Sequence, residues 1–170
     1  AVVGGGGGAS VLSADACEQA GVEVPWLTEA TQRKLSEHVP IAGASIRNPI
    51  DANFVGSTER FTMLLQLIAD DPNIDFLIMH LSGDPPPMLE PESWARFPDR
   101  LEQNFSAALE GIAKPLAVTI RPPRTMLGME MMVAVVPKLS ALGLSVFTSV
   151  ASCAQAVNRL QTWRQRRDAQ

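Results

Sequence analysis

The sequence predicts an α/β fold in which helices cover both faces of a mainly parallel sheet. Three observations support this prediction. Short apolar runs alternate with segments of helical periodicity, which is the pattern of successive βαβ units. A run of glycines, Gly4 to Gly8, connects the first apolar run to the first helical segment. Residues 74–81 are almost all apolar, as in a strand that is buried on both faces.

The elements follow one another in this alternating order. The expected strands cover residues 1–3, 22–24, 74–81, 116–120 and 145–147. The expected helices cover about residues 9–20, 28–38, 57–70, 93–112, 125–142 and 149–166. Gly21 closes the first helix, and Thr28 and Ser57 are the expected N-caps of the next two. Pro98 makes the start of the fourth helix uncertain, and Pro137 should kink or interrupt the fifth.

About five strands with helices on both faces match a flavodoxin-like, doubly wound domain with strand order 2-1-3-4-5. We expect a single domain over residues 1–170. Ligands of such sheets bind beyond the carboxyl ends of the strands, where the first and third strands meet. The glycine turn and the turn at Ser82, Gly83 and Asp84 should both face that crevice.

The glycine turn is the strongest functional signal. A helix that starts directly after glycines exposes backbone N–H groups, and its dipole adds positive charge there, so the turn can bind a phosphate or carboxylate. The alternative is a flexible linker. The flanking Val2, Val3, Val11 and Leu12 argue against a linker, because they need a core to bury them.

Composition excludes several other functions. The chain has 170 residues, 46% of them hydrophobic, and a net charge of −4, which argues against nucleic-acid binding. No apolar run reaches the roughly 18 residues of a membrane span. Cys17 and Cys153 lack metal-ligand spacing, so no metal site is expected, and reduced thiols suggest a cytoplasmic protein. Because the chain opens inside a strand, we expect a piece of a longer polypeptide.

Several motifs in order resemble one family, the nucleoside-diphosphate-forming acyl-CoA synthetases related to succinyl-CoA synthetase. The motifs are Gly5-Gly6-Gly7-Gly8-Ala9-Ser10-Val11-Leu12-Ser13-Ala14-Asp15, Leu27-Thr28-Glu29-Ala30-Thr31, Asn48-Pro49-Ile50-Asp51, Asp71-Pro72-Asn73-Ile74-Asp75, Lys114-Pro115 and Gly143-Leu144-Ser145-Val146-Phe147. The resemblance covers essentially the whole chain. Gly5 and Ser10 depart from it, because the family usually has Asn and Gly at these positions.

The resemblance implies a three-stage reaction. An acyl-CoA and phosphate give an acyl phosphate, a histidine takes up the phosphoryl group, and a nucleoside diphosphate receives it. CoA, ADP or ATP, and Mg²⁺ belong to the parent enzyme, and none is expected on this domain alone. The partners would be CoA-binding, phosphohistidine and ATP-grasp domains. Phosphate would contact this domain at Gly6, Gly7, Gly8, Ala9 and Ser10, with possible loop contacts from Asn48, Asp51 and Gly83. No residue of this chain is expected to be catalytic.

Other chemistry-bearing residues have simpler interpretations. Asn48 and Asp51 would more often organise their own loop through short side-chain hydrogen bonds. His38 ends a surface helix, and His80 is more often a hydrogen-bonded core histidine than a site residue. Arg121 and Arg124 follow a strand and could meet a phosphate or an acidic partner, although solvated loop positions are more common.

Two other functions remain open. One is a stand-alone flavodoxin-like module that binds a mononucleotide or flavin, for which Trp26, Trp94 or Trp163 would have to stack on the ring because the chain has no Tyr. The other is a regulatory domain that only docks its neighbours.

Overall fold

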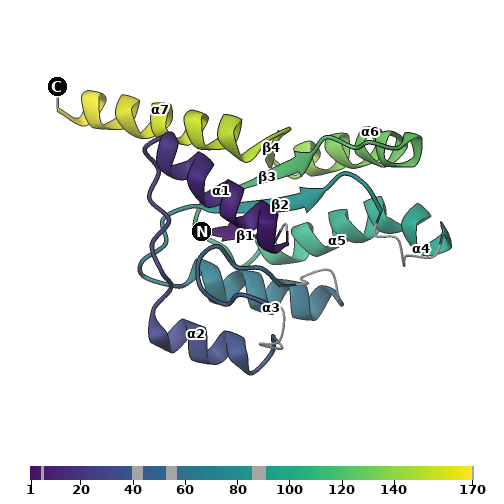
Figure 1. Cartoon of the computed structure of the whole chain (residues 1–170), viewed down its shortest axis with the longest axis horizontal. Helices are drawn as coiled ribbons and strands as arrows, with labels where there is room; N and C mark the ends of the chain where they lie inside the picture. Colours follow the sequence, from purple (N-terminus) through teal and green to yellow (C-terminus); the bar gives the residue numbers. More distant parts are fainter. Residues whose placement is uncertain (5, 40–43, 53–56, 86–90, 170) are drawn as a thin grey trace.

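The structure is a computed structural model that describes residues 1–4, 6–39, 44–52, 57–85 and 91–169. The strands are β1 (Val2–Val3), β2 (Leu77–Ser82), β3 (Leu116–Arg121) and β4 (Ser145–Phe147). The helices are α1 (Gly7–Gln19), α2 (Glu29–Ser36), α3 (Thr58–Ala69), α4 (Pro91–Ala95), α5 (Phe97–Leu109), α6 (Met126–Ala141) and α7 (Val150–Asp168). The α/β class with helices on both faces of a parallel sheet is confirmed (Figure 1).

The four strands pair in parallel in the order β1-β2-β3-β4. Ile50 adds a parallel bridge to Val3 on the outer side of β1. The Gly4 N–H donates to the Ile50 carbonyl at 2.8 Å, and the Ile50 N–H donates to the Val2 carbonyl at 2.8 Å. With this bridge counted as the second strand, the spatial order is the expected 2-1-3-4-5.

The prediction of a strand at residues 22–24 is wrong. These residues form no strand in the structure, because the backbone around Ile50 takes the place beside β1. The segment around Ile50 therefore supplies a bridge at the position where the second strand was expected.

Side chains alternate between two apolar layers along the strands, as the two-residue period of a strand requires. Val2, Ile78 and Ala117 pack with Cys17 and Cys153, which come from α1 and α7. The neighbouring strand residues pack in a larger cluster with α3, α5 and α6. In Figure 1, α1 and α7 lie on one side of the sheet, and α2 lies outside α3.

Local signals place most helix ends as expected. The side chains of Thr28 and Ser57 accept hydrogen bonds from backbone N–H groups three residues later, as N-caps do. Gly21 has a φ of 75° directly after α1. The helix expected over residues 93–112 is instead two helices, with Pro98 in the first turn of α5. Helix α6 continues through Pro137 without interruption.

Candidate functional site at the carboxyl edge of the sheet

The glycine turn connects β1 to α1 at the carboxyl edge of the sheet. Gly4 has a φ of 90° and Gly6 a φ of 81°, a backbone region that residues with a Cβ resist. A Cβ on Gly4 would lie 2.6 Å from the carbonyl oxygen of His80. Gly7 and Gly8 already belong to α1 and are not among the glycines with a positive φ. Gly5 lies outside the described residues.

The first turn of α1 is open to solvent. Gly6 is the N-cap and makes no side-chain cap, since it has no side chain. Gly6, Gly7 and Gly8 are all exposed. The first intrahelical bond runs from the Ser10 N–H to the Gly6 carbonyl at 2.8 Å, so the preceding N–H groups of the turn have no carbonyl within the helix. Such an end can bind an anion.

Ser10 differs from the other members of the predicted phosphate site. Its side chain is on the inward face of α1, and the residue is only 6% exposed. Its Oγ has no hydrogen-bond partner among the described residues. Ala9, next to it, is half-buried. The structure thus divides the predicted site into three exposed glycines and a buried hydroxyl.

Asp51 lies beside the same turn. A Cβ on Gly7 would be 3.5 Å from Oδ2 of Asp51, so this carboxylate is an anion close to the N-terminus of α1. Gly7, Ser10, Ser45 and Asp51 are among the residues that line a shallow cavity of about 410 Å³ along α1. The Asp51 backbone is held by two hydrogen bonds with Ser45. Asp51 therefore adds negative charge where a phosphate was expected.

Asn48 is used by the fold. Its Oδ1 accepts a hydrogen bond from the Val2 N–H at 2.9 Å, and its Nδ2 donates to the Pro25 carbonyl at 2.8 Å. The side chain is buried, and it links β1 to Pro25, which lies 23 residues before Asn48 in the chain. Both the oxygen and the nitrogen of its amide are thus engaged in hydrogen bonds within the fold.

His80 is a hydrogen-bonded core histidine. Its Nδ1 lies 2.8 Å from Oγ1 of Thr119 on the neighbouring strand, and the residue is buried. Burial lowers the pKa of His80, and the positive charge of Arg121 lowers it further. The imidazole is therefore neutral near pH 7. His38, by contrast, lies exposed after α2.

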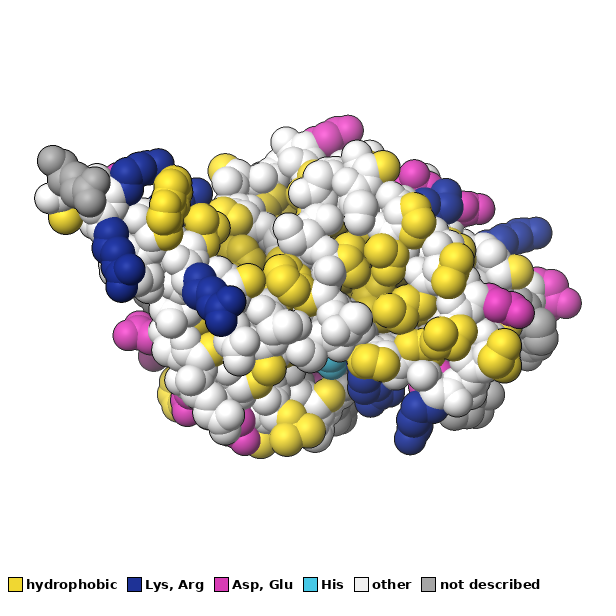
Figure 2. Space-filling view, turned by 90° about the horizontal axis from the view of Figure 1, so that it is seen from above, with side chains coloured by type: hydrophobic (Ala, Val, Ile, Leu, Met, Phe, Trp, Pro, Cys, Tyr) yellow, Lys and Arg dark blue, Asp and Glu magenta, His cyan; other side chains and the backbone are white. Residues whose placement is uncertain are grey.

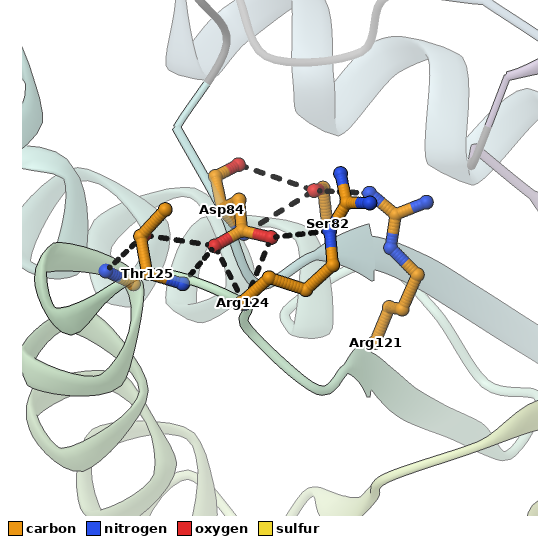
Figure 3. Close-up of polar contacts among 6 residues, drawn as sticks. Ser82, Asp84, Arg121, Arg124 and Thr125 are labelled. Carbon is orange, nitrogen blue, oxygen red and sulfur yellow. Dashed lines mark hydrogen bonds and ion pairs between the residues drawn. The ribbon is translucent and has the colours of Figure 1, made fainter.

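A second strand–helix corner lies at the same edge, between β3 and α6 (Figure 3). Asp84 accepts hydrogen bonds from the backbone N–H groups of Arg124 (2.9 Å) and Thr125 (3.0 Å) and from the Thr125 hydroxyl (2.9 Å). Thr125 in turn caps α6 by accepting from the Gly128 N–H. Burial alone would raise the pKa of Asp84, but these hydrogen bonds and the Arg124 charge hold it below its ordinary value.

Gly83 belongs to this corner as a packing residue. It is buried, and a Cβ there would overlap the carbonyl oxygen of Arg121. A Cβ on Gly128 would lie 2.5 Å from the carbonyl oxygen of Gly83. The sequence predicted that the turn at Ser82, Gly83 and Asp84 faces the crevice, but it did not indicate that Asp84 binds the backbone N–H groups of Arg124 and Thr125.

The remaining arginine and tryptophan candidates make contacts within the chain. Arg121 donates to the Ser82 hydroxyl at 3.0 Å, and Arg124 is 3.7 Å from Asp84 with a side chain that is 87% exposed. Trp94 stacks on Phe97 and is buried, and Arg47 and Arg167 lie over Trp26 and Trp163. In the described ranges, no three potential metal ligands come together, and no helix is long and apolar enough to cross a membrane.

Comparison with known proteins supports the expected resemblance. No family model matches the chain. Over 82 residues it is 38% identical to an ADP-forming acetate–CoA ligase of Archaeoglobus fulgidus, a match that covers 48% of this chain and 12% of that protein.

Solved structures match the chain over nearly its whole length. The apo form of acetyl-coenzyme A synthetase 1 of Candidatus Korarchaeum cryptofilum matches with a TM-score of 0.73 and 20% identity, over 98% of this chain and 33% of that one. The same enzyme in complex with phosphate and ADP gives a TM-score of 0.72. A Pyrococcus horikoshii protein gives 0.69 over 93% of this chain and 34% of that one. The chain thus shares its fold with part of these proteins, among them an acetyl-coenzyme A synthetase, and it spans about a third of their length.

Proposed function

We propose that this chain is a domain of a nucleoside-diphosphate-forming acyl-CoA synthetase, and that it helps to bind phosphate or phosphohistidine. The overall reaction would convert an acyl-CoA, phosphate and a nucleoside diphosphate reversibly into the acid, CoA and a nucleoside triphosphate. The sequence match to an ADP-forming ligase and the fold match to acetyl-CoA synthetases support this assignment.

The open N-terminus of α1 is the observation that carries the proposed role. Because Gly6, Gly7 and Gly8 are exposed and have no side chains, no side chain of their own covers or caps their backbone N–H groups. These groups lie at the carboxyl edge of the sheet, which is where doubly wound domains bind their ligands. Backbone donors and a helix dipole are fixed in place before charge develops, so they need no reorganisation during phosphoryl transfer.

Asp51 sets a condition on this role. A bare phosphate at the turn would meet the Asp51 carboxylate close to Gly7, and like charges at short range repel. Phosphate should therefore arrive together with positive charge. Arg121 and Arg124 at the same edge of the sheet could supply it, as could a cation that travels with the phosphate.

The chemistry itself would lie on other domains. CoA, ADP or ATP, Mg²⁺ and the phosphorylated histidine are assigned to domains beyond this chain, in one polypeptide or on a partner subunit. The isolated chain should then neither form acyl-CoA nor incorporate phosphate from ATP. The same assignment places the protein in the cytoplasm, in keeping with two buried free thiols.

The role can be tested by placing a charge at the turn in the complete synthetase. A Cβ on Gly8 meets nothing within 4 Å, so Gly8→Asp adds a carboxylate without crowding, and Gly8→Asn adds the same shape without charge. Losing one such electrostatic contact typically lowers the rate about a hundredfold or more. We expect a loss of this order in phosphohistidine formation for Gly8→Asp, with CoA affinity nearly unchanged. Gly8→Asn should lose much less.

Other results would point to the alternatives. Normal phosphate incorporation in Gly8→Asp would mean that the turn is structural and would favour a docking domain. A purified chain with flavin absorbance would favour the stand-alone module instead.

A further inference from the structure

Helix α6 is apolar over most of its circumference, and the exposed Glu130 is the exception on its outward face. Its sequence carries only Glu130 and Lys138 as charged residues. The inward face places Met131, Val135 and Leu139 in the core. On the outward face, Met126 is 77% exposed, Met129 50% and Val133 72%. A helix with apolar residues on both its inner and outer faces is normally covered on both faces, yet this structure covers only the inner face of α6.

Helix α3 gives the clearest contrast, whereas α1 exposes Val11 (62%) and Leu12 (70%), and α7 exposes Leu160 (49%) and Trp163 (55%). Helix α3 buries Phe61, Leu64 and Leu65 on its inner face. Its exposed large hydrophobic residue is Met63, which is 37% exposed. Figure 2 shows hydrophobic side chains gathered on the side of the molecule that α6 occupies. Scattered exposed hydrophobic residues are ordinary, but a contiguous patch marks an interaction surface.

Helix α6 is also held firmly in place. At its start, Gly128 packs against the Gly83 carbonyl, and Asp84 binds the N–H group of the capping Thr125. Near its end, Lys138 pairs with Asp99 at 3.0 Å and with Glu102, both on α5. The exposed stripe is therefore presented on a helix that is fixed at both ends, which lowers the cost of binding a partner.

The charge near the stripe is mixed, because Glu130 is exposed on α6 itself and two arginines precede the helix. Arg124, directly before α6, is 87% exposed in its side chain. Arg121 at the end of β3 is hydrogen bonded to Ser82, and within the described ranges it forms no ion pair. A matching surface would be apolar in the middle and acidic on the side that faces these arginines.

We propose that the outward face of α6, made by Met126, Leu127, Met129 and Val133, is the surface on which another domain of the synthetase packs. This inference rests on the proposed function, because it needs a larger enzyme. The solved chains that share the fold are about three times as long as this one, which covers 33% of them. They therefore hold enough additional protein to cover such a stripe. The packing domain would present an apolar patch with acidic residues toward Arg121 and Arg124.

Cysteine labelling tests the proposal directly. Val133→Cys places a thiol on the stripe, while the native Cys17 and Cys153 are buried and react slowly because burial raises their thiol pKa values. Ser106→Cys on the exposed side of α5 is the matched control. Relative to this control, maleimide should label Val133→Cys at least about tenfold more slowly in the complete synthetase than in the isolated chain.

Three results would overturn the proposal. Equal relative rates in both proteins would mean that the stripe is solvated. Protection that grows with the concentration of the isolated chain, together with dimers in sedimentation, would mean that a second copy covers it. An unchanged melting temperature of the synthetase in Val133→Asp, which should lower it without affecting the isolated chain, would also contradict docking. None of these measurements involves CoA or phosphate, so they can fail independently of the Gly8→Asp test.

Discussion

The β1–α1 and β3–α6 corners lie at the same edge of one sheet but treat their helix N-termini in opposite ways. At β3–α6, the protein itself supplies the anion: Asp84 accepts from the N–H groups of Arg124 and Thr125, and Thr125 caps the helix. At β1–α1, Gly6 replaces a capping side chain, and the glycines of the first turn are exposed. One corner is closed by internal hydrogen bonds, and the other is left open.

This difference distinguishes glycines that packing requires from glycines that packing does not require. Both corners contain glycines, since Gly83 follows β2 and Gly128 lies in the first turn of α6, so glycine content alone does not reveal a binding turn. Gly83 and Gly128 are required by close packing, whereas Gly8 has open space around it. A glycine that sits in open space on an exposed helix start has no packing reason to be there, which is why we assign the anion-binding role to α1.

The largest expected effect comes from adding a methyl group at the closed corner. In Gly83→Ala the new Cβ would overlap the Arg121 carbonyl, so we expect the free energy of unfolding to fall by about 3 kcal/mol. Gly8→Ala should instead raise it by about 0.5–1 kcal/mol, because alanine is the better helix residue. Urea unfolding of both variants measures this. Equal effects would remove the distinction between the corners.

A smaller effect is expected within the open corner. Gly6 has a φ of 81° and a ψ of 158°, so Gly6→Ala should cost about 1–3 kcal/mol in stability through backbone strain alone. Gly7→Ala, whose Cβ would make only an ordinary contact with Asp51 at 3.5 Å, is the control and should not lose stability, because Gly7, like Gly8, is already helical. Thermal unfolding compares the two, and a neutral Gly6→Ala would contradict the turn geometry.

The smallest effect is confined to acid. The pKa of Asp84 is lowered in the folded protein, so the unfolded chain binds its proton first and stability falls with falling pH. The contribution of the carboxylate is complete above the ordinary value of 3.8 and is lost as the pH drops through the folded pKa. Asp84→Asn should therefore be less stable than the native protein at pH 6. The difference in free energy of unfolding between the two proteins, measured by urea unfolding, should narrow below pH 4. A difference that stays constant with pH would contradict the role of the Asp84 carboxylate.

Sequence reasoning located the features that depend on neighbouring residues. The N-caps at Thr28 and Ser57, the closing Gly21 and the buried strand after residue 76 all follow from short patterns. Residues 22–24 look like a strand but form none, because pairing beside β1 is decided by the hydrogen bonds of Ile50 across almost fifty residues. The short alternation Val22-Glu23-Val24 carries no information about such a distant partner.

At the candidate site too, the sequence indicated the local feature, the glycine turn, but not the contacts that residues distant in the chain make with it. The strand–glycine–helix order identified the turn, and the structure shows where its left-handed residues lie, at Gly4 and Gly6. The approach of Asp51 to Gly7 and the inward direction of Ser10 depend on how α1 packs on the sheet. The network of Asp84 joins residues about forty positions apart, which no local pattern indicates.

The side chain of Asn48 has a consequence for the way this sheet can associate. Together with Ile50, it uses the outward-facing hydrogen-bonding groups of Val2 and Gly4, so the β1 end of the sheet offers these groups to no incoming strand. At the opposite end, β4 is the last strand and pairs only with β3 in the sheet. The sheet is therefore closed in one direction and can be extended in the other, and any strand added from outside, by a partner or by misassembly, should join at Ser145 to Phe147.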